Sequence, residues 1–155
     1  MVKPKTYMDQ FMNLSLPLAD VTDEFISGEF IHWNADGEAV KMHEVDPMDN
    51  AVCRCVFHNT SGRSDRLGTN KVTILDGEYL AEIDVYDDSS GDYGNGDWLA
   101  VADLSIVRDG VTYTGGFLTP GEAGETIWAQ CIVPPGGLER GPLFMLVKLL
   151  SPFVL

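Results

Sequence analysis

Three residues on one short run have types that bind transition metals. Cys53, Cys55 and His58 form a C-x-C-x2-H pattern, and Cys131 could in principle supply a fourth ligand. A zinc site needs four such ligands in tetrahedral geometry. The spacing is not that of a zinc finger or ribbon, and free cysteine is among the most buried residue types. We therefore interpret the pair as small buried residues on one strand face and expect no metal site here.

A second group consists of oxygen ligands in an acidic loop over residues 87–97. The side chains suited to Ca²⁺ are Asp87, Asp88, Asp92, Asn95 and Asp97. The EF-hand spacing is absent from this loop. A weak Ca²⁺ site and a solvated acidic loop remain alternatives at this point.

The sequence contains none of the common motifs for nucleophilic catalysis or phosphate binding. The chain has no G-x-S-x-G elbow, P-loop, G-x-G-x-x-G or H-E-x-x-H sequence, and its three histidines all lie in the first half. Three Trp and five Tyr could stack against sugars, but Trp98 and Trp128 lie in apolar runs typical of a core or an interface. We expect a protein that is not an enzyme, with no catalytic residue and no cofactor.

The charge balance narrows the possible partners. Ten Lys and Arg stand against 24 Asp and Glu, which gives a formal net charge of −14. Nucleic acids and anionic membranes bind mainly through cationic side chains, so neither is expected as a partner. No run approaches the ~20 apolar residues of a membrane helix. No secretory signal is evident, and an odd number of cysteines favours a reducing compartment during synthesis.

Length and patterning together predict one all-β domain. The 155 residues fit a single domain, and 16 Gly and eight Pro separate short β-branched and aromatic runs. Asp76-Gly77 between residues 72–75 and 79–86 predicts a hairpin, and Asp109-Gly110 predicts a second tight turn. Residues 143–150 suit a buried strand, with a helix as the alternative. We expect a small β-barrel or β-sandwich over residues 24–155.

Residues 1–23 are predicted to form an extended N-terminal arm. Pro4 and Pro17 interrupt the segment, and its apolar residues are too numerous for a free tail. They should lie against a core or a neighbouring subunit. A polar loop over residues 59–71 holds much of the scarce positive charge, which suits docking to an acidic neighbour. The candidate subunit or capsid contacts are Phe11, Leu14, Leu16, Leu18, Arg63 and Arg66.

The second half of the chain carries an ordered series of turn-and-strand motifs. In sequence order they are TILDGEY (73–79), DVYD (84–87), YGNGDWLAV (93–101), GFLTP (116–120), GETIWA (124–129), a Pro134-Pro135 exit and GPL (141–143). This series resembles the capsid decoration, or head-stabilising, proteins of tailed bacteriophages. The resemblance covers roughly residues 72–150.

The resemblance implies a viral structural protein of β-tulip-like fold. Such a subunit would form a homotrimer, bind the major capsid protein on the outer capsid surface and bridge neighbouring capsomers. It would be made in the host cytoplasm and reside in the virion. Two alternatives remain open: another virion component, such as a head-completion or tail protein, and a Ca²⁺-dependent carbohydrate-binding module.

Overall fold

The computed structural model describes residues 3–4, 13–42, 52–58, 71–75 and 77–155, with only the backbone described for 3–4, 13–15 and 52–58. These residues form an all-β fold with no helix among them, as predicted. The strands are β1 (Lys3–Pro4), β2 (Asn13–Pro17), β3 (Phe30–Trp33), β4 (Ala39–Val40), β5 (Val52–His58), β6 (Lys71–Leu75), β7 (Tyr79–Ile83), β8 (Trp98–Arg108), β9 (Val111–Pro120), β10 (Thr126–Val133) and β11 (Met145–Val154).

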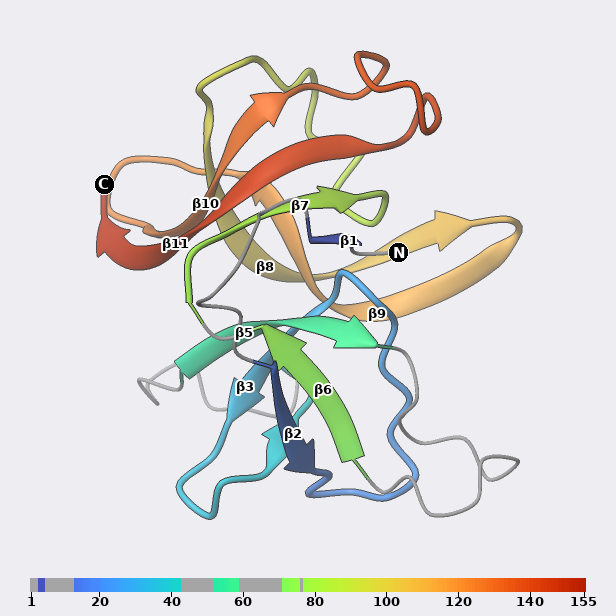
Figure 1. Cartoon of the computed structure of the whole chain (residues 1–155), viewed down its shortest axis with the longest axis vertical. Coiled ribbons are helices and arrows are strands. Elements are labelled where there is room, and N and C mark those ends of the chain that lie inside the picture. The colour runs from blue at the N-terminus through green and yellow to red at the C-terminus, as the bar shows by residue number, and fades with distance from the viewer. Residues whose placement is uncertain (1–2, 5–12, 43–51, 59–70, 76) are drawn as a thin grey trace.

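The strands are arranged in two lobes (Figure 1). The upper lobe has the order β1-β7-β11-β10-β8-β9 and curls into a half-barrel, and the lower lobe has the order β3-β5-β6-β2, with β4 beside β3. Between the lobes, β9 and β3 share a single Cα pair, Phe30 with Gly116. The hydrogen-bonded sheet is therefore continuous but narrow where the lobes meet.

The hairpin of β8 and β9 confirms the turn predicted at Asp109-Gly110. Both residues have positive φ, 53° and 76°, the geometry that a two-residue hairpin turn requires. The register is unbroken from Leu99 opposite Pro120 to Arg108 opposite Val111. The run after Trp98 is thus one long strand without a bulge.

The hairpin predicted at Asp76-Gly77 is wrong. The flanking strands β6 and β7 do not pair with each other: β6 pairs with β5 and β2, whereas β7 pairs with β11 and β1. Strand β6 belongs to the lower lobe and β7 to the upper one (Figure 1). The reason lies in burial, because Val72 and Ile74 fill the core of the lower lobe while Tyr79, Ala81 and Ile83 fill that of the upper lobe.

The apolar run near the C-terminus is a strand, and the helical alternative is excluded. Met145, Val147 and Leu149 are buried in strict alternation with more exposed residues, which is the period of two of a sheet. Strand β11 lies between β7 and β10 and extends to Val154, beyond the predicted end at residue 150.

The N-terminal segment supplies both outermost strands of the sheet. Strand β1 pairs with β7 at one edge, and β2 pairs with β6 at the other. Leu16 and Leu18 are each 5% exposed and belong to the smaller core cluster, which also contains Phe25 and Ile31. Of the two fates left open for this segment, packing against the chain's own core is the one observed for Leu16 and Leu18. A contact with a second subunit stays a prediction.

Candidate interaction surface

The carboxylates of the acidic loop over residues 87–97 take part in hydrogen bonds that fix the loop. Asp87 accepts hydrogen bonds from the backbone N–H and hydroxyl of Ser89 at 3.0 and 2.7 Å. Partial burial acts to raise the pKa of Asp87, but these hydrogen bonds outweigh it and lower the pKa. Asp97 accepts the backbone N–H of Gly94 at 2.6 Å. Across the described residues, no three His, Cys, Asp or Glu side chains are grouped to hold a metal ion.

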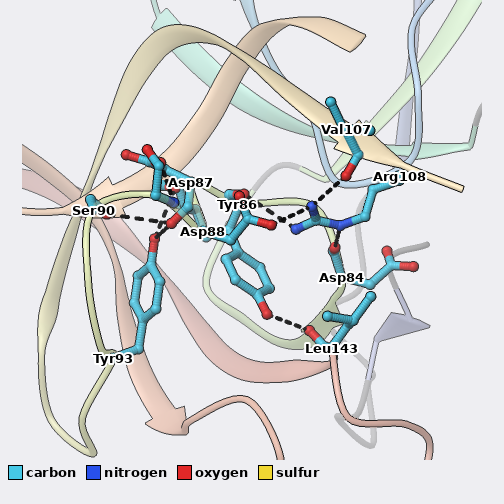
Figure 2. A network of polar contacts seen from close by, with 11 residues as sticks. Asp84, Tyr86, Asp87, Asp88, Ser90, Tyr93, Val107, Arg108 and Leu143 are labelled. Atoms are coloured by element: carbon cyan, nitrogen blue, oxygen red, sulfur yellow. Dashed lines mark hydrogen bonds and ion pairs between the residues drawn. The ribbon is translucent and has the colours of Figure 1, made fainter. Parts of the chain in front are cut away.

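Arg108, which the sequence did not single out, fastens this loop to the β8–β9 hairpin (Figure 2). Its guanidinium donates to the backbone oxygens of Asp84 and Tyr86 at 2.8 and 3.3 Å and pairs with the Asp88 carboxylate at 2.9 Å. The Arg108 side chain is only 11% exposed, so these partners replace water. The one available signal was its place as the first cation after a long acidic stretch.

Two tyrosines complete the network (Figure 2). The Tyr86 hydroxyl donates to the backbone oxygen of Leu143 at 2.8 Å, and the Tyr93 hydroxyl donates to that of Asp87. Burial raises the pKa of both phenols, which therefore stay protonated hydrogen-bond donors. The network positions loops of the upper lobe and offers no activated nucleophile or base.

A buried ion pair lies where the two lobes meet. The Lys41 ammonium donates to both carboxylate oxygens of Glu29, to Oε2 at 2.8 Å, and to the backbone oxygen of Thr114 on β9 at 3.3 Å. It also lies 4.7 Å from the centre of the Phe25 ring. Burial raises the pKa of Glu29 to about 7, although Lys41 acts to lower it. Thr114 belongs to the upper lobe, so this pair links the lobes beside their single backbone pairing.

Exposed apolar side chains gather at one corner of the upper lobe. Phe153 is 39% exposed and meets the ring of Trp98, 37% exposed, edge-on at 5.1 Å between ring centres. Val154 and Leu155 follow at 68% and 42% exposed. The backbone of Leu155 exchanges hydrogen bonds with Gly124 and Glu125, so these side chains are presented on a paired backbone. Val154 points to the opposite side of β11 from Phe153, because successive strand residues alternate between the two faces. We call Trp98, Phe153 and Leu155 the Trp98 patch.

The Trp98 patch is the best-formed candidate interaction surface among the described residues. Large apolar side chains held on a rigid sheet and clustered at the surface are typical of protein contact sites. Sequence reasoning placed Trp98 in a core or an interface but treated residues 151–155 only as a tail. The sequence indicated an apolar surface here through three large apolar residues, Phe153, Val154 and Leu155, within residues 151–155.

The residues predicted to make subunit or capsid contacts do not gather at this patch. Leu16 and Leu18 are buried in the lower lobe, and Leu14 lies on β2, where only its backbone is described. Phe11, Arg63 and Arg66 lie outside the described residues.

The cysteines give no support to a metal site. Cys53, Cys55 and His58 are on β5, whose side chains are not described. Cys131 is fully buried on β10, and burial raises the pKa of its thiol to about 11, which keeps it protonated at neutral pH.

Comparison with known proteins adds no relative. No family model, curated protein or solved structure matches the chain. In the described part of the chain, no helix has the length and apolar character needed to cross a bilayer.

Proposed function

We propose that this protein is a capsid decoration subunit of a tailed bacteriophage. It binds the outer surface of the phage head, contacts the major capsid protein and stabilises the shell by bridging neighbouring capsomers. It acts as an oligomer, a homotrimer by analogy with the family it resembles, and resides in the virion. Its function depends on adhesion and shape, without catalytic residues.

The single observation that carries the proposal is the Trp98 patch. Its three apolar side chains, Trp98, Phe153 and Leu155, are exposed on a backbone fixed by strand pairing and by the hydrogen bonds of Leu155. Ordered apolar surface of this kind gains free energy when a second surface covers it. The all-β fold and the order of motifs in residues 72–150 agree with the same function.

Stabilisation of a shell follows from mass action. A protein that binds only the assembled shell lowers its free energy by RT ln(1 + [L]/Kd) at every site. Small contributions at many equivalent sites add up, so a decoration subunit needs neither a large interface nor a reactive group. The strong negative charge also keeps such an abundant protein soluble before it binds.

The test uses phage heads that lack this protein. Purified protein is added, and bound copies per particle are counted by quantitative mass spectrometry, with the temperature of shell disruption as a second readout. We expect hundreds of bound copies and a higher disruption temperature. A handful of copies at one vertex would identify a head-completion protein, and no binding to the heads would refute the decoration function.

A matched pair of variants tests the patch itself. Leu155→Asp places a charge in the Trp98 patch at a side chain that is 42% exposed, and Leu143→Asp makes the same change outside the patch at one that is 48% exposed. Both proteins should fold normally, because neither side chain is buried. We expect Leu155→Asp to weaken shell binding about tenfold or more and Leu143→Asp to leave it unchanged.

A further inference from the structure

The two lobes have separate hydrophobic cores that meet at β3. The buried apolar residues form two clusters, one in each lobe. Phe30 begins β3 in the lower lobe, yet it is 3% exposed and belongs to the cluster of the upper lobe. Its neighbour Ile31 is fully buried in the cluster of the lower lobe. The start of β3 is therefore where the lower lobe packs against the upper one.

Two glycines of β9 make room for this contact. A Cβ atom at Gly115 would lie 2.5 Å from Oε1 of Glu29 and 2.9 Å from its Cδ. A Cβ atom at Gly116 would lie 2.6 Å from the backbone oxygen of Phe30. The backbone of β9 thus forms a recess that holds the Glu29 carboxyl. The residues that make up what we call the lobe contact are Glu29, Phe30, Lys41, Thr114, Gly115 and Gly116.

The charged groups that act on the Glu29 carboxyl are Lys41 and Asp23. The Lys41 ammonium lowers the pKa of Glu29, as does a hydrogen bond with the backbone of Ile26, whereas Asp23 raises it. Strand β9 contains no acidic residue, basic residue or histidine, and Tyr113 is its only titratable side chain. Burial has the largest effect and raises the pKa of Glu29 to about 7. The closed contact therefore favours a protonated carboxyl.

We propose that the lobe contact opens locally while both lobes stay folded, and that loss of the Glu29 proton promotes this opening. Each lobe has its own core, so the contact can separate without dispersing either one. Separation returns the Glu29 carboxyl to water, where a negative charge is no longer penalised by burial. The inference concerns the conformation of the chain and does not depend on the decoration function.

The size of the effect follows from the pKa of Glu29 in the two states. It is about 7 in the closed contact and has its ordinary value of 4.5 once the carboxyl is solvated. Below pH 4.5 the carboxyl is protonated in both states, and opening is least favourable. As pH rises through 7 the closed contact must bury a carboxylate. Proton linkage then increases the opening equilibrium constant about tenfold from pH 6 to pH 8.

The test is native-state hydrogen exchange at pH 6 and pH 8, in water and in low urea concentrations. Protection factors are compared for the amides of Phe30 and Gly116, the pair that joins the lobes, and of Ile74 and Val147, one in each core. We expect the contact amides to be at least about tenfold less protected than the core amides, with exchange that hardly depends on urea. Their protection should fall about tenfold from pH 6 to pH 8.

A matched pair of variants assigns the pH dependence. Glu29→Gln keeps the shape of the side chain without its titration and should abolish the fall in protection. Glu24→Gln removes an exposed carboxylate five positions earlier and should leave the fall unchanged. Gly115→Ala brings a methyl group against Glu29 and should lower the protection of the contact amides at both pH values.

Three results would overturn the inference. The first is equal protection and equal urea dependence of contact and core amides, which would mean that the contact opens only when the whole protein unfolds. The second is a protection factor at the contact that does not change from pH 6 to pH 8. The third is the same change in Glu29→Gln as in the wild type, which would assign the titration to another group.

Discussion

Replacing Lys41 with methionine should destabilise the protein more than any change at an exposed lysine. Methionine keeps much of the length of the side chain but removes the ammonium. The Glu29 carboxyl, whose side chain is 1% exposed, then loses its buried cation, and the backbone oxygen of Thr114 loses a donor. Removing one partner of a buried ion pair costs about 3–5 kcal/mol, because an uncompensated charge remains.

Protonation of Glu29 limits that cost and makes it depend on pH. Burial already raises the pKa of Glu29 to about 7 with Lys41 present, and removal of Lys41 takes away an interaction that lowers it. In Lys41→Met the Glu29 carboxyl is therefore neutral at pH 6, and the free energy of unfolding should fall by about 1–2 kcal/mol there. At pH 8 the free energy of unfolding should fall by about 3 kcal/mol. For a chain of this length, 3 kcal/mol corresponds to a fall in Tm of about 6–12 °C.

The assay is thermal and urea unfolding of Lys41→Met at both pH values, beside Lys71→Met as the control. Lys71 is exposed on β6, so its substitution should change the free energy of unfolding by less than about 0.5 kcal/mol. The double variant Glu29→Gln/Lys41→Met removes both charges and should be more stable than Lys41→Met alone. The reasoning fails if Lys41→Met unfolds at the same temperature as the control, or if its loss does not grow from pH 6 to pH 8.

Further predictions concern the contact between the two lobes and the hydrogen-bond network of Arg108. Folding raises the pKa of Glu29 from 4.5 to about 7. The stabilisation that comes from protonated Glu29 is therefore fully present below pH 4.5 and is lost as the pH rises through 7. In urea titrations, the free energy of unfolding of the wild type relative to Glu29→Gln should increase by up to about 3 kcal/mol from pH 8 to pH 4.5. Gly116→Ala would bring a methyl group to 2.6 Å from the Phe30 backbone oxygen, and calorimetry should show a loss of about 1–3 kcal/mol. Arg108→Met should cost about 2 kcal/mol and speed hydrogen exchange in the acidic loop, whereas equal exchange in both proteins would contradict the role given to the guanidinium. Calorimetric titration with Ca²⁺ should give no binding heat, since the carboxylates of residues 87–97 do not converge on a common point; saturable heat would show that they rearrange.

Local chemistry was enough to predict the all-β class and the strongest hairpin. Asp109-Gly110 connects strands whose residues are neighbours in sequence, so turn geometry and pairing agree. Asp76-Gly77 has the same dipeptide but a different outcome, because the strand after it pairs with β11, more than sixty positions along the chain. A turn signal specifies a change of direction but not the partner of the next strand.

The candidate surfaces were less accessible to sequence reasoning for a related reason. Trp98 and Phe153 become neighbours only through β10, which lies between their strands in the sheet. The Glu29–Lys41 ion pair likewise depends on the pairing of β3 with β4, since Glu29 precedes β3 and Lys41 follows β4. Each feature is a product of strand pairing, which periodicity alone does not determine.

The placement of β1 and β2 at opposite ends of the strand order has a consequence for biosynthesis. Each is synthesised before its partner: Pro4 of β1 pairs with Ala81 of β7, 77 positions later, and Pro17 of β2 pairs with Lys71 of β6, 54 positions later. Strands β1 and β2 therefore remain without these partners until β7 and β6 have been synthesised. Contacts so distant along the chain slow folding, so completion of the two sheet margins is expected to be a late event in maturation of the newborn protein.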